Sequence, residues 1–236
     1  MIVVIGGDKG GTGKTTVATN LAVMRASVIG AEELIFMDTD DTPSGSFWCS
    51  QREDSEIEPR ITSIQKRSKA VGTEAIALSK KYQDIIIDAG GGDTPEQRGA
   101  LLAADKAIFP LRPSQFDLWT LGRLSTLVNN IKEVNEKLEP YILLNQANTN
   151  PKVKEPEFAD AKLIIEDYPI FKFLDHVIHD RIAFRKAAIN GQGVVEYRPE
   201  DRKAVQEVHG LYSIIYDVKV KPKRARKKAK TSEAVV

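Results

Sequence analysis

A glycine-rich segment near the start of the chain carries the strongest chemical signal in the sequence. It follows the apolar run Ile2–Ile5 and reads Lys9-Gly10-Gly11-Thr12-Gly13-Lys14-Thr15-Thr16. A glycine turn between a buried strand and a helix presents backbone N–H groups to an anion, and the helix dipole adds to the attraction. Lys14 would then reach the β- and γ-phosphates of a nucleotide, and the Thr15 hydroxyl would bind Mg²⁺. Residues 10–16 are therefore predicted to bind a nucleotide. A dinucleotide motif is excluded because Thr16 stands where its third glycine would be.

Carboxylates follow two later apolar runs. Asp38-Thr39-Asp40-Asp41 comes after Leu34–Met37, and Asp88 comes after Ile85–Ile87 and before three glycines. The carboxyl ends of parallel strands line the crevice in which α/β proteins bind ligands. Asp88 has the form of a Walker B aspartate, and we expect it to hold Mg²⁺ through a water because this ion gives up its hydration shell reluctantly. For Asp40 and Asp41, capping of a turn or helix is the alternative interpretation.

The head of the glycine loop departs from the general phosphate-loop pattern. That pattern begins with a glycine five positions before Gly13, where this chain has Asp8, and a second lysine, Lys9, follows. The arrangement resembles the deviant Walker A motif of the ParA/Soj-type partition ATPases, relatives of the Min-system and nitrogenase-iron-protein ATPases. The resemblance covers about residues 1–216. Because the loop begins at residue 6, it points to the small plasmid-partition subgroup without an N-terminal helix-turn-helix domain.

The resemblance implies an ATP-sandwich homodimer and assigns roles within it. In the family the early lysine, here Lys9, crosses the interface to the nucleotide of the other subunit. Asp38 corresponds to the carboxylate near the Mg²⁺ shell, and Asp40 to the one that orients the attacking water. Asp41 replaces the usual proline, which leaves open whether Asp40 or Asp41 positions the water. The expected catalytic residues are Lys9, Lys14 and Asp40, and the expected metal-binding residues are Thr15, Asp38 and Asp88.

Two further segments match the family near the nucleotide. Pro113 lies in a proline-containing loop after an apolar run, and Asn145 follows Tyr141–Leu144, where family members place an asparagine beside the base. An ordinary turn role for Asn145 is the alternative. Residues 145–148 lack the lysine and aspartate of the GTPase Asn-Lys-x-Asp signature, which favours ATP over GTP. ATP and Mg²⁺ are therefore the expected cofactors.

Short apolar runs alternate with helical patterns along the body of the chain. This alternation predicts an α/β fold with a doubly wound, mostly parallel sheet and helices on both faces. After a loop at Asn150–Pro156, the later elements are predicted to be a helix, a weak strand and two terminal helices. Their ranges are Phe158–Ile165, Phe171–Leu174, Arg181–Ile189 and Asp201–Ile215. The strands of the sheet are predicted at Ile2–Ile5, Leu34–Met37, Ile85–Ile87, Ala107–Phe109 and Tyr141–Leu144.

Charge is distributed unevenly along the 236 residues. The net charge is +1, but residues 219–236 carry eight basic side chains and one acid, so the rest of the chain has a net charge of −6. We therefore expect a P-loop ATPase domain at 1–217 and a basic, disordered tail at 218–236. A single cysteine excludes an intrachain disulfide and a four-cysteine cluster shared by two subunits. No apolar stretch approaches membrane-spanning length, and the chain is expected in the cytoplasm.

The leading hypothesis is a slow, Mg²⁺-dependent ATPase for DNA partition. Its ATP-bound dimer would bind DNA without sequence preference on the nucleoid, and a ParB-type centromere-binding protein would stimulate hydrolysis and release it. An ATPase scaffold that positions a non-DNA cargo is one alternative. A Min-type membrane regulator is another, but the tail lacks the apolar helix face that membrane binding needs. A spacing of four places two arginines on one exposed helix face, and the expected DNA-binding residues are Arg181, Arg185, Lys186, Lys223, Arg224, Arg226, Lys227 and Lys228.

Overall fold

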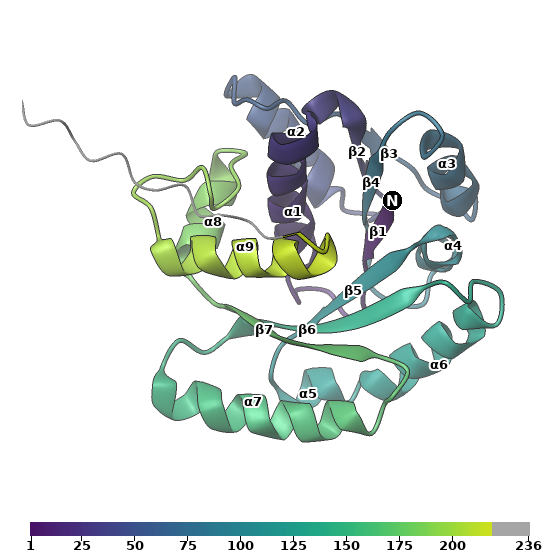
Figure 1. Cartoon of the computed structure of the whole chain (residues 1–236), viewed down its shortest axis with the longest axis vertical. Coiled ribbons are helices and arrows are strands. Elements are labelled where there is room, and N and C mark those ends of the chain that lie inside the picture. The colour runs from purple at the N-terminus through teal and green to yellow at the C-terminus, as the bar shows by residue number, and fades with distance from the viewer. Residues whose placement is uncertain (219–236) are drawn as a thin grey trace, which may run out of the picture.

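One sheet of parallel strands lies between two layers of helices (Figure 1). The computed structural model describes residues 1–218, apart from the side chain of Phe116. The segment 219–236, with most of the predicted tail, lies outside the described residues. Within residues 1–218 the strands are β1 (Ile2–Ile5), β2 (Leu34–Asp38), β3 (Ser63–Gln65), β4 (Asp84–Asp88), β5 (Lys106–Leu111), β6 (Glu139–Ala147) and β7 (Lys172–His179).

Helices cover both faces of this sheet, as the alternating pattern predicts. Four of them, α1, α2, α8 and α9, pack on one face, and α3 to α7 cover the other (Figure 1). No helix within residues 1–218 combines the length and apolar character needed to cross a bilayer. The bounds are α1 (Lys14–Ile29), α2 (Ser44–Asp54), α3 (Val71–Leu78), α4 (Pro95–Ala103), α5 (Gln115–Leu118), α6 (Leu121–Lys132), α7 (Pro151–Glu166), α8 (Ile182–Ile189) and α9 (Arg202–Ile215), with a 3₁₀ turn η1 at Ala31–Glu33.

The predicted fold class is confirmed. Every strand pair is parallel, and the order across the sheet is β3-β2-β4-β1-β5-β6-β7. The central strands are buried on both faces, which explains their unbroken apolar sequences. The two edge strands are less apolar: β3 has three residues, and β7 includes polar positions such as Asp175 and His176. Because an edge strand needs less apolar surface, the sequence gives no clear pattern for β3. For the same reason the apolar pattern of β7 ends at Leu174, five residues before the strand itself ends.

The loop predicted at Asn150–Pro156 is wrong. The chain is helical from Pro151, and the Asn150 side chain accepts a hydrogen bond from the backbone N–H of Lys152 at 3.1 Å. Proline is well suited to the first helical position, where its missing N–H has no intrahelical acceptor. Pro156 lies within the helix at an exposed position. Pro151 therefore marks the start of α7, and Pro156 lies inside the helix rather than in a loop.

Strand register brings the polar residues to one edge. β1 is central, between β4 and β5, and the glycine loop follows its carboxyl end. Asp88, the last residue of β4, pairs with Ile5 of β1 on one side and with Asp38 of β2 on the other. Since all strands run in the same direction, the two aspartates and the glycine loop must meet at the carboxyl edge of the sheet.

Candidate functional site

The glycine loop between β1 and α1 has the backbone conformation of an anion cradle. Gly11 and Gly13 have positive φ angles of 76° and 88°, which L-residues with side chains rarely adopt. A Cβ at Gly13 would also lie 2.3 Å from the amide nitrogen of Asn145. The Gly13 carbonyl accepts the first helical hydrogen bond of α1 from Val17. The loop therefore directs the start of α1, with its unsatisfied N–H groups, towards the carboxyl edge of the sheet.

Lys14 lies buried within this loop. Its side chain crosses the loop, and its Nζ donates a hydrogen bond to the carbonyl oxygen of Lys9 at 2.9 Å. Burial lowers the pKa of the Lys14 ammonium, while the nearby charges of Asp88 and Asp40 oppose that shift. A cation that is poorly solvated and within reach of two carboxylates is well placed to bind a phosphate.

Asp88 is the most unusual ionisable group of the site. It is 1% exposed, and neither of its carboxylate oxygens makes a hydrogen bond within the described residues. Burial raises the pKa of Asp88 to about 7, with the Asp38 and Asp40 charges acting in the same direction. The Thr15 hydroxyl and the Lys14 ammonium oppose that rise. A buried carboxylate without partners is costly, and such a group usually has a ligand.

The residues around Asp88 fit a hydrated Mg²⁺ ion. Mg²⁺ prefers oxygen ligands and is commonly bound through one or two carboxylates together with substrate phosphates. Asp88 supplies two oxygens without partners, and the Thr15 hydroxyl adjoins them. No group of three or more acidic, histidine or cysteine side chains suited to a metal occurs within residues 1–218. The site therefore suits an ion that arrives with nucleotide phosphates rather than one held by protein ligands alone.

Asp38 has a different environment from Asp88. Its Oδ2 accepts a hydrogen bond from the backbone N–H of Ser46 at 2.8 Å, and its Oδ1 accepts one from that of Asp40 at 3.1 Å. Burial raises the pKa of Asp38, and these two backbone N–H groups oppose the rise. Asp38 thus holds the segment that connects β2 to α2 and lies beside the predicted Mg²⁺ site. The two orphaned oxygens belong to Asp88.

Asp40 and Asp41 have different environments in the structure. The Asp40 carboxylate contributes to the electrostatics of both Lys14 and Asp88, and its side chain lies 3.6 Å from the Cβ position of Gly90. The Asp41 side chain is 98% exposed and pairs with Arg67. Of the two candidates for the water-orienting residue, Asp40 faces the site and Asp41 faces solvent. Sequence alone left this choice open.

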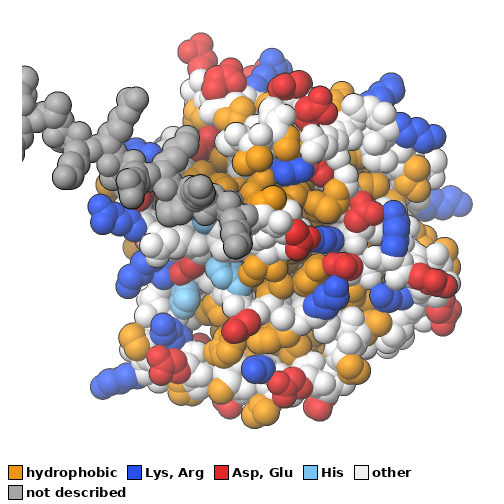
Figure 2. Space-filling view, viewed as in Figure 1, with side chains coloured by type: hydrophobic (Ala, Val, Ile, Leu, Met, Phe, Trp, Pro, Cys, Tyr) orange, Lys and Arg blue, Asp and Glu red, His pale blue; other side chains and the backbone are white. Residues whose placement is uncertain are grey.

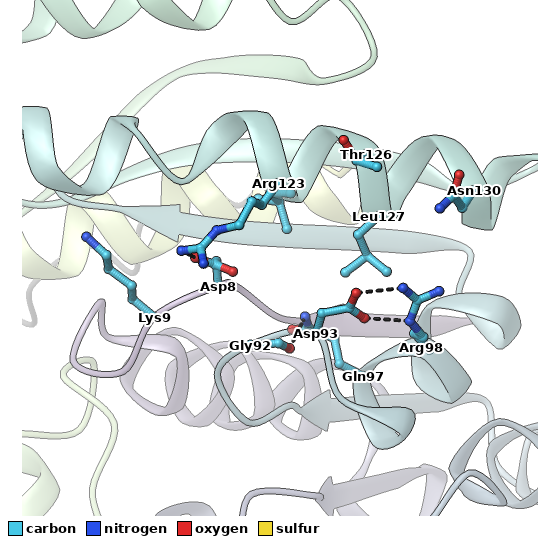
Figure 3. Close-up of a pocket in the computed structure, with 11 residues that line it drawn as sticks. Asp8, Lys9, Gly92, Asp93, Gln97, Arg98, Arg123, Thr126, Leu127 and Asn130 are labelled. Carbon is cyan, nitrogen blue, oxygen red and sulfur yellow. Dashed lines mark hydrogen bonds and ion pairs between the residues drawn. The ribbon is translucent and has the colours of Figure 1, made fainter.

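Lys9 and Asp8 turn towards the segment that contains α5 and α6. Lys9 Nζ lies 3.7 Å from Asp117 Oδ1, and Asp8 accepts a hydrogen bond from Arg123 at 2.6 Å. Asp8 and Lys9 line one end of a cleft of about 460 Å³ between α4 and α6 (Figure 3). In this conformation the predicted interface lysine, Lys9, pairs with a carboxylate of its own chain.

Asn145, predicted to lie beside a nucleotide base, contacts the glycine loop. The Asn145 side chain is 2% exposed, and its amide donates a hydrogen bond to the Thr12 carbonyl at 2.7 Å. It therefore lies beneath the glycine loop and supports it from β6. Its place beside a nucleotide base stays a prediction.

Arg112 is a site residue that the motifs did not identify. It donates hydrogen bonds of 2.6 Å to the Gly11 carbonyl and to the Gln146 side chain, which fastens the tip of the glycine loop to the end of β6. Arg112 and Pro113 border a hollow of about 320 Å³ beyond this tip. The predicted place of Pro113 near a bound nucleotide stays a prediction. In the sequence, the position of Arg112 directly after an apolar strand was the feature that could have identified it as a site residue.

The predicted exposed pair of Arg181 and Arg185 is wrong. Arg181 precedes α8, and its guanidinium donates to the buried carboxylate of Glu207 at 2.6 and 3.0 Å. Arg185 is exposed and pairs with Asp180. The i, i+4 argument failed because the helix begins one residue later and α9 supplies an acidic partner. The predicted tail cations Lys223, Arg224, Arg226, Lys227 and Lys228 lie outside the described residues.

A different group of cations adjoins Lys186. Arg202 and Lys203, at the start of α9, are exposed and line a shallow hollow together with Lys186. Lys and Arg side chains gather along the left edge of Figure 2, where Figure 1 places α8 and the start of α9. Glu200 and Asp201 border the same hollow. The three cations therefore come from two helices that are distant from the glycine loop in sequence, and two acidic residues lie beside them.

Comparison with known proteins gives one curated relative by sequence. The chain is 23% identical over 210 residues to the maintenance of carboxysome distribution protein A of Halothiobacillus neapolitanus. The aligned region covers 86% of this chain and 90% of that protein. No protein-family model matches the chain.

Three solved structures each match more than nine-tenths of the chain. A variant of McdA from Cyanothece in complex with ATP has a TM-score of 0.74 at 16% identity, covering 94% of this chain and 98% of that one. The cell division ATPase MinD of Pyrococcus furiosus has a TM-score of 0.70 at 20% identity, covering 92% and 98%. A plasmid partition protein, described as putative, from Borrelia burgdorferi bound to AMPPNP has a TM-score of 0.65 at 16% identity, covering 92% and 98%. With its seven parallel strands and its glycine loop after the central strand, the chain has the P-loop NTPase fold of the MinD and ParA type.

Proposed function

We propose that this protein is an Mg²⁺-dependent ATPase that works as a nucleotide-controlled dimer to position a large cargo. The observation that carries the proposal is the buried carboxylate of Asp88, which has no hydrogen-bond partner within the described residues and lies beside Thr15 and Lys14. A cation bound with nucleotide phosphates would satisfy both orphaned oxygens. The ATP and AMPPNP complexes of proteins with the same fold support this assignment.

Each residue of the site has a defined task in this proposal. The N–H groups of residues 10–16 and the Lys14 ammonium bind the phosphates, with Lys14 leaving the Lys9 carbonyl that it contacts now. Thr15 and Asp88 would hold the Mg²⁺ shell, and a bound ion would supply charge neutralisation for the transferring phosphoryl group. Asp40 orients the water that attacks the γ-phosphate. Phosphoryl transfer needs little more than this positioning and charge stabilisation.

A binding assay tests the core of the proposal. Titration calorimetry with ATP should show binding in the presence of Mg²⁺ and a large loss of affinity in EDTA. Lys14→Ala should abolish binding or turnover, because it removes a buried cation that interacts with both Asp88 and Asp40. Lys132→Ala, on α6, is the matched control and should behave like the wild type. Mg²⁺-independent binding of equal strength would contradict the proposal.

The dimer part of the proposal depends on Lys9. We infer that ATP with Mg²⁺ draws Lys9 from Asp117 of its own chain to the nucleotide of a second chain. Light scattering of Asp40→Ala, which should retain ATP, is expected to show a dimer with ATP and a monomer with ADP. The double variant Lys9→Ala/Asp40→Ala should remain monomeric while still binding ATP. A monomer of Asp40→Ala at saturating ATP would refute the sandwich arrangement.

For the cargo, we propose DNA partition as the first candidate. The ATP dimer would bind DNA phosphates without sequence preference, and a ParB-type partner would stimulate hydrolysis and release it on the nucleoid. The exposed cations Lys186, Arg202 and Lys203 form the surface on the body of the protein, and the tail cations outside the described residues add to it. Two such surfaces in one dimer would raise the effective concentration of contacts, which gives the nucleotide control over DNA binding.

A protein assembly is the second candidate cargo. The curated relative and the McdA structure favour it, because the relative is described as maintaining carboxysome distribution. Both candidates use the same ATPase cycle and differ in the partner that stimulates it. Measuring which neighbouring gene product raises the ATPase rate would separate them: a sequence-specific DNA-binding protein supports partition, and a protein that binds the surface of an assembly supports the second candidate.

A further inference from the structure

One polar side chain at the site is completely buried and has no place in the chemistry described above. Gln97 lies in the first turn of α4 and is 0% exposed. Its Oε1 accepts a hydrogen bond from the backbone N–H of Gly7, and its Nε2 donates one to the carbonyl of Gly92, both at 2.8 Å. The orientation of the amide is fixed because a backbone N–H only donates and a carbonyl only accepts.

The two partners of Gln97 belong to the two loops that would surround the phosphates. Gly7 lies at the start of the glycine loop, and Gly92 lies in the glycine segment after Asp88. The loops also bond directly, since the N–H of Gly92 donates to the carbonyl of Gly7 at 3.0 Å. Three hydrogen bonds therefore join the loops at one place, and Figure 3 shows Gln97 beside Gly92 on the wall of the cleft.

The packing around these bonds leaves little freedom. A Cβ at Gly6 would come within 2.7 Å of Gln97 Oε1, and one at Gly91 would lie 3.1 Å from the backbone of Lys9. A side chain at either position would be crowded where the loops touch each other and the Gln97 side chain. A change in the position of one loop must displace the other or break buried hydrogen bonds.

The helix that carries Gln97 is anchored at both ends. The Thr94 hydroxyl accepts a hydrogen bond from the backbone N–H of Gln97 at 3.1 Å and caps the start of α4. Asn135 donates to the carbonyls of Leu101 and Ala104 at the other end. Gln97 is therefore presented to the loops from a fixed helix rather than from a third loop.

We propose that Gln97 is a positioning residue that couples the glycine loop to the Gly90–Gly92 loop. Through this coupling, the presence or absence of the γ-phosphate at one loop sets the position of the other. The inference rests on the proposed ATPase function and deepens it. Gln97 contacts no reacting group, so its loss should change how the second loop responds to the γ-phosphate and how fast hydrolysis proceeds. The affinity of the glycine loop for the nucleotide diphosphate should change little.

The test compares Gln97→Met with the wild type by hydrogen exchange and kinetics. Met keeps most of the volume of Gln and makes neither hydrogen bond. In the wild type, AMPPNP should slow exchange of residues 89–94 more than ADP does. In Gln97→Met this difference should disappear while protection of residues 9–16 remains. We expect kcat to fall about tenfold or more and the ADP dissociation constant to change less than about threefold.

Two further variants complete the design. Gln97→Glu keeps the oxygen that faces Gly7 but sets an oxygen against the Gly92 carbonyl. It should therefore also lose the difference between AMPPNP and ADP in the exchange of residues 89–94. This variant replaces Gln97→Met if that protein does not fold. Gln206→Glu makes the same charge change at an exposed position of α9 and should match the wild type.

The outcomes distinguish this inference from the proposed function. If the wild type binds and hydrolyses ATP, and both folded Gln97 variants keep its kcat and its response at residues 89–94, Gln97 serves packing alone and the inference is wrong. If the wild type itself binds no nucleotide, the proposed function fails first.

Discussion

Raising the pH is expected to destabilise the nucleotide-free protein through one residue, Asp88. Its pKa is about 7 in the folded chain, against 3.8 for an unperturbed aspartate. Between these values the folded state binds more protons at this site than the unfolded state, so the free energy of unfolding falls as the pH rises. From pH 5 to pH 8 the loss amounts to about 2–3 kcal/mol, and it is complete just above the folded pKa.

The assay is urea unfolding of the wild type and of Asp88→Asn at intervals between pH 5 and 8. Other titrating groups, including Asp38 and His209, are present in both proteins, so the difference between the two curves isolates Asp88. That difference should change by about 2–3 kcal/mol in favour of Asn as the pH rises. Saturating Mg²⁺ and ADP should reduce the pH dependence of the wild type alone, since a bound cation stabilises the ionised carboxylate. Parallel curves without ligand would refute the reasoning about the buried charge.

Three further predictions concern the rest of the site and the DNA contact. Asp40→Ala should retain ATP and slow hydrolysis by about 10²-fold or more, whereas Asp41→Ala should stay within about twofold of the wild type; the reverse pattern in a phosphate-release assay would assign the water to Asp41. Asn145→Ala should lower the free energy of unfolding by about 1–3 kcal/mol, because the buried Thr12 carbonyl loses its partner, and thermal melts that match the wild type would contradict this. A chain ending at Val218 should bind DNA more weakly and with a flatter salt dependence, in which the tail accounts for a slope of at most about −7. Unchanged fluorescence anisotropy curves across the salt series would leave Lys186, Arg202 and Lys203 as the candidates.

Local sequence was sufficient for the central part of the fold. Runs such as Ile2–Ile5 and Ile85–Ile87 are apolar at every position because their strands are buried on both faces, and that pattern is specific to an interior parallel sheet. The glycine loop was equally readable, since positive φ angles at Gly11 and Gly13 require residues without a side chain. At the edges the constraint weakens, and there β3, the length of β7 and the start of α7 could not be predicted.

Residues that approach the site along their own segment can be recognised from local sequence patterns. Lys14, Thr15 and Asp88 follow strands whose direction and burial are encoded locally, so their convergence follows from a parallel sheet. Partners from distant segments are defined only once the chain is packed. Arg181 donates to Glu207, which is 26 residues away in the sequence. Asn145 donates to the carbonyl of Thr12, which is 133 residues away.

The same limit applies to Gln97, Asp40 and Asp41. Nothing in the sequence around Gln97 indicates its role. Its two hydrogen-bond partners are backbone groups, the Gly7 N–H and the Gly92 carbonyl, which lie 90 and 5 residues away in the sequence. Asp40 and Asp41 are adjacent and chemically identical, and only the direction in which the folded loop turns each side chain separates them. Burial and orientation are properties of the packed chain, and they decide which of the residues supplied by the sequence can act together.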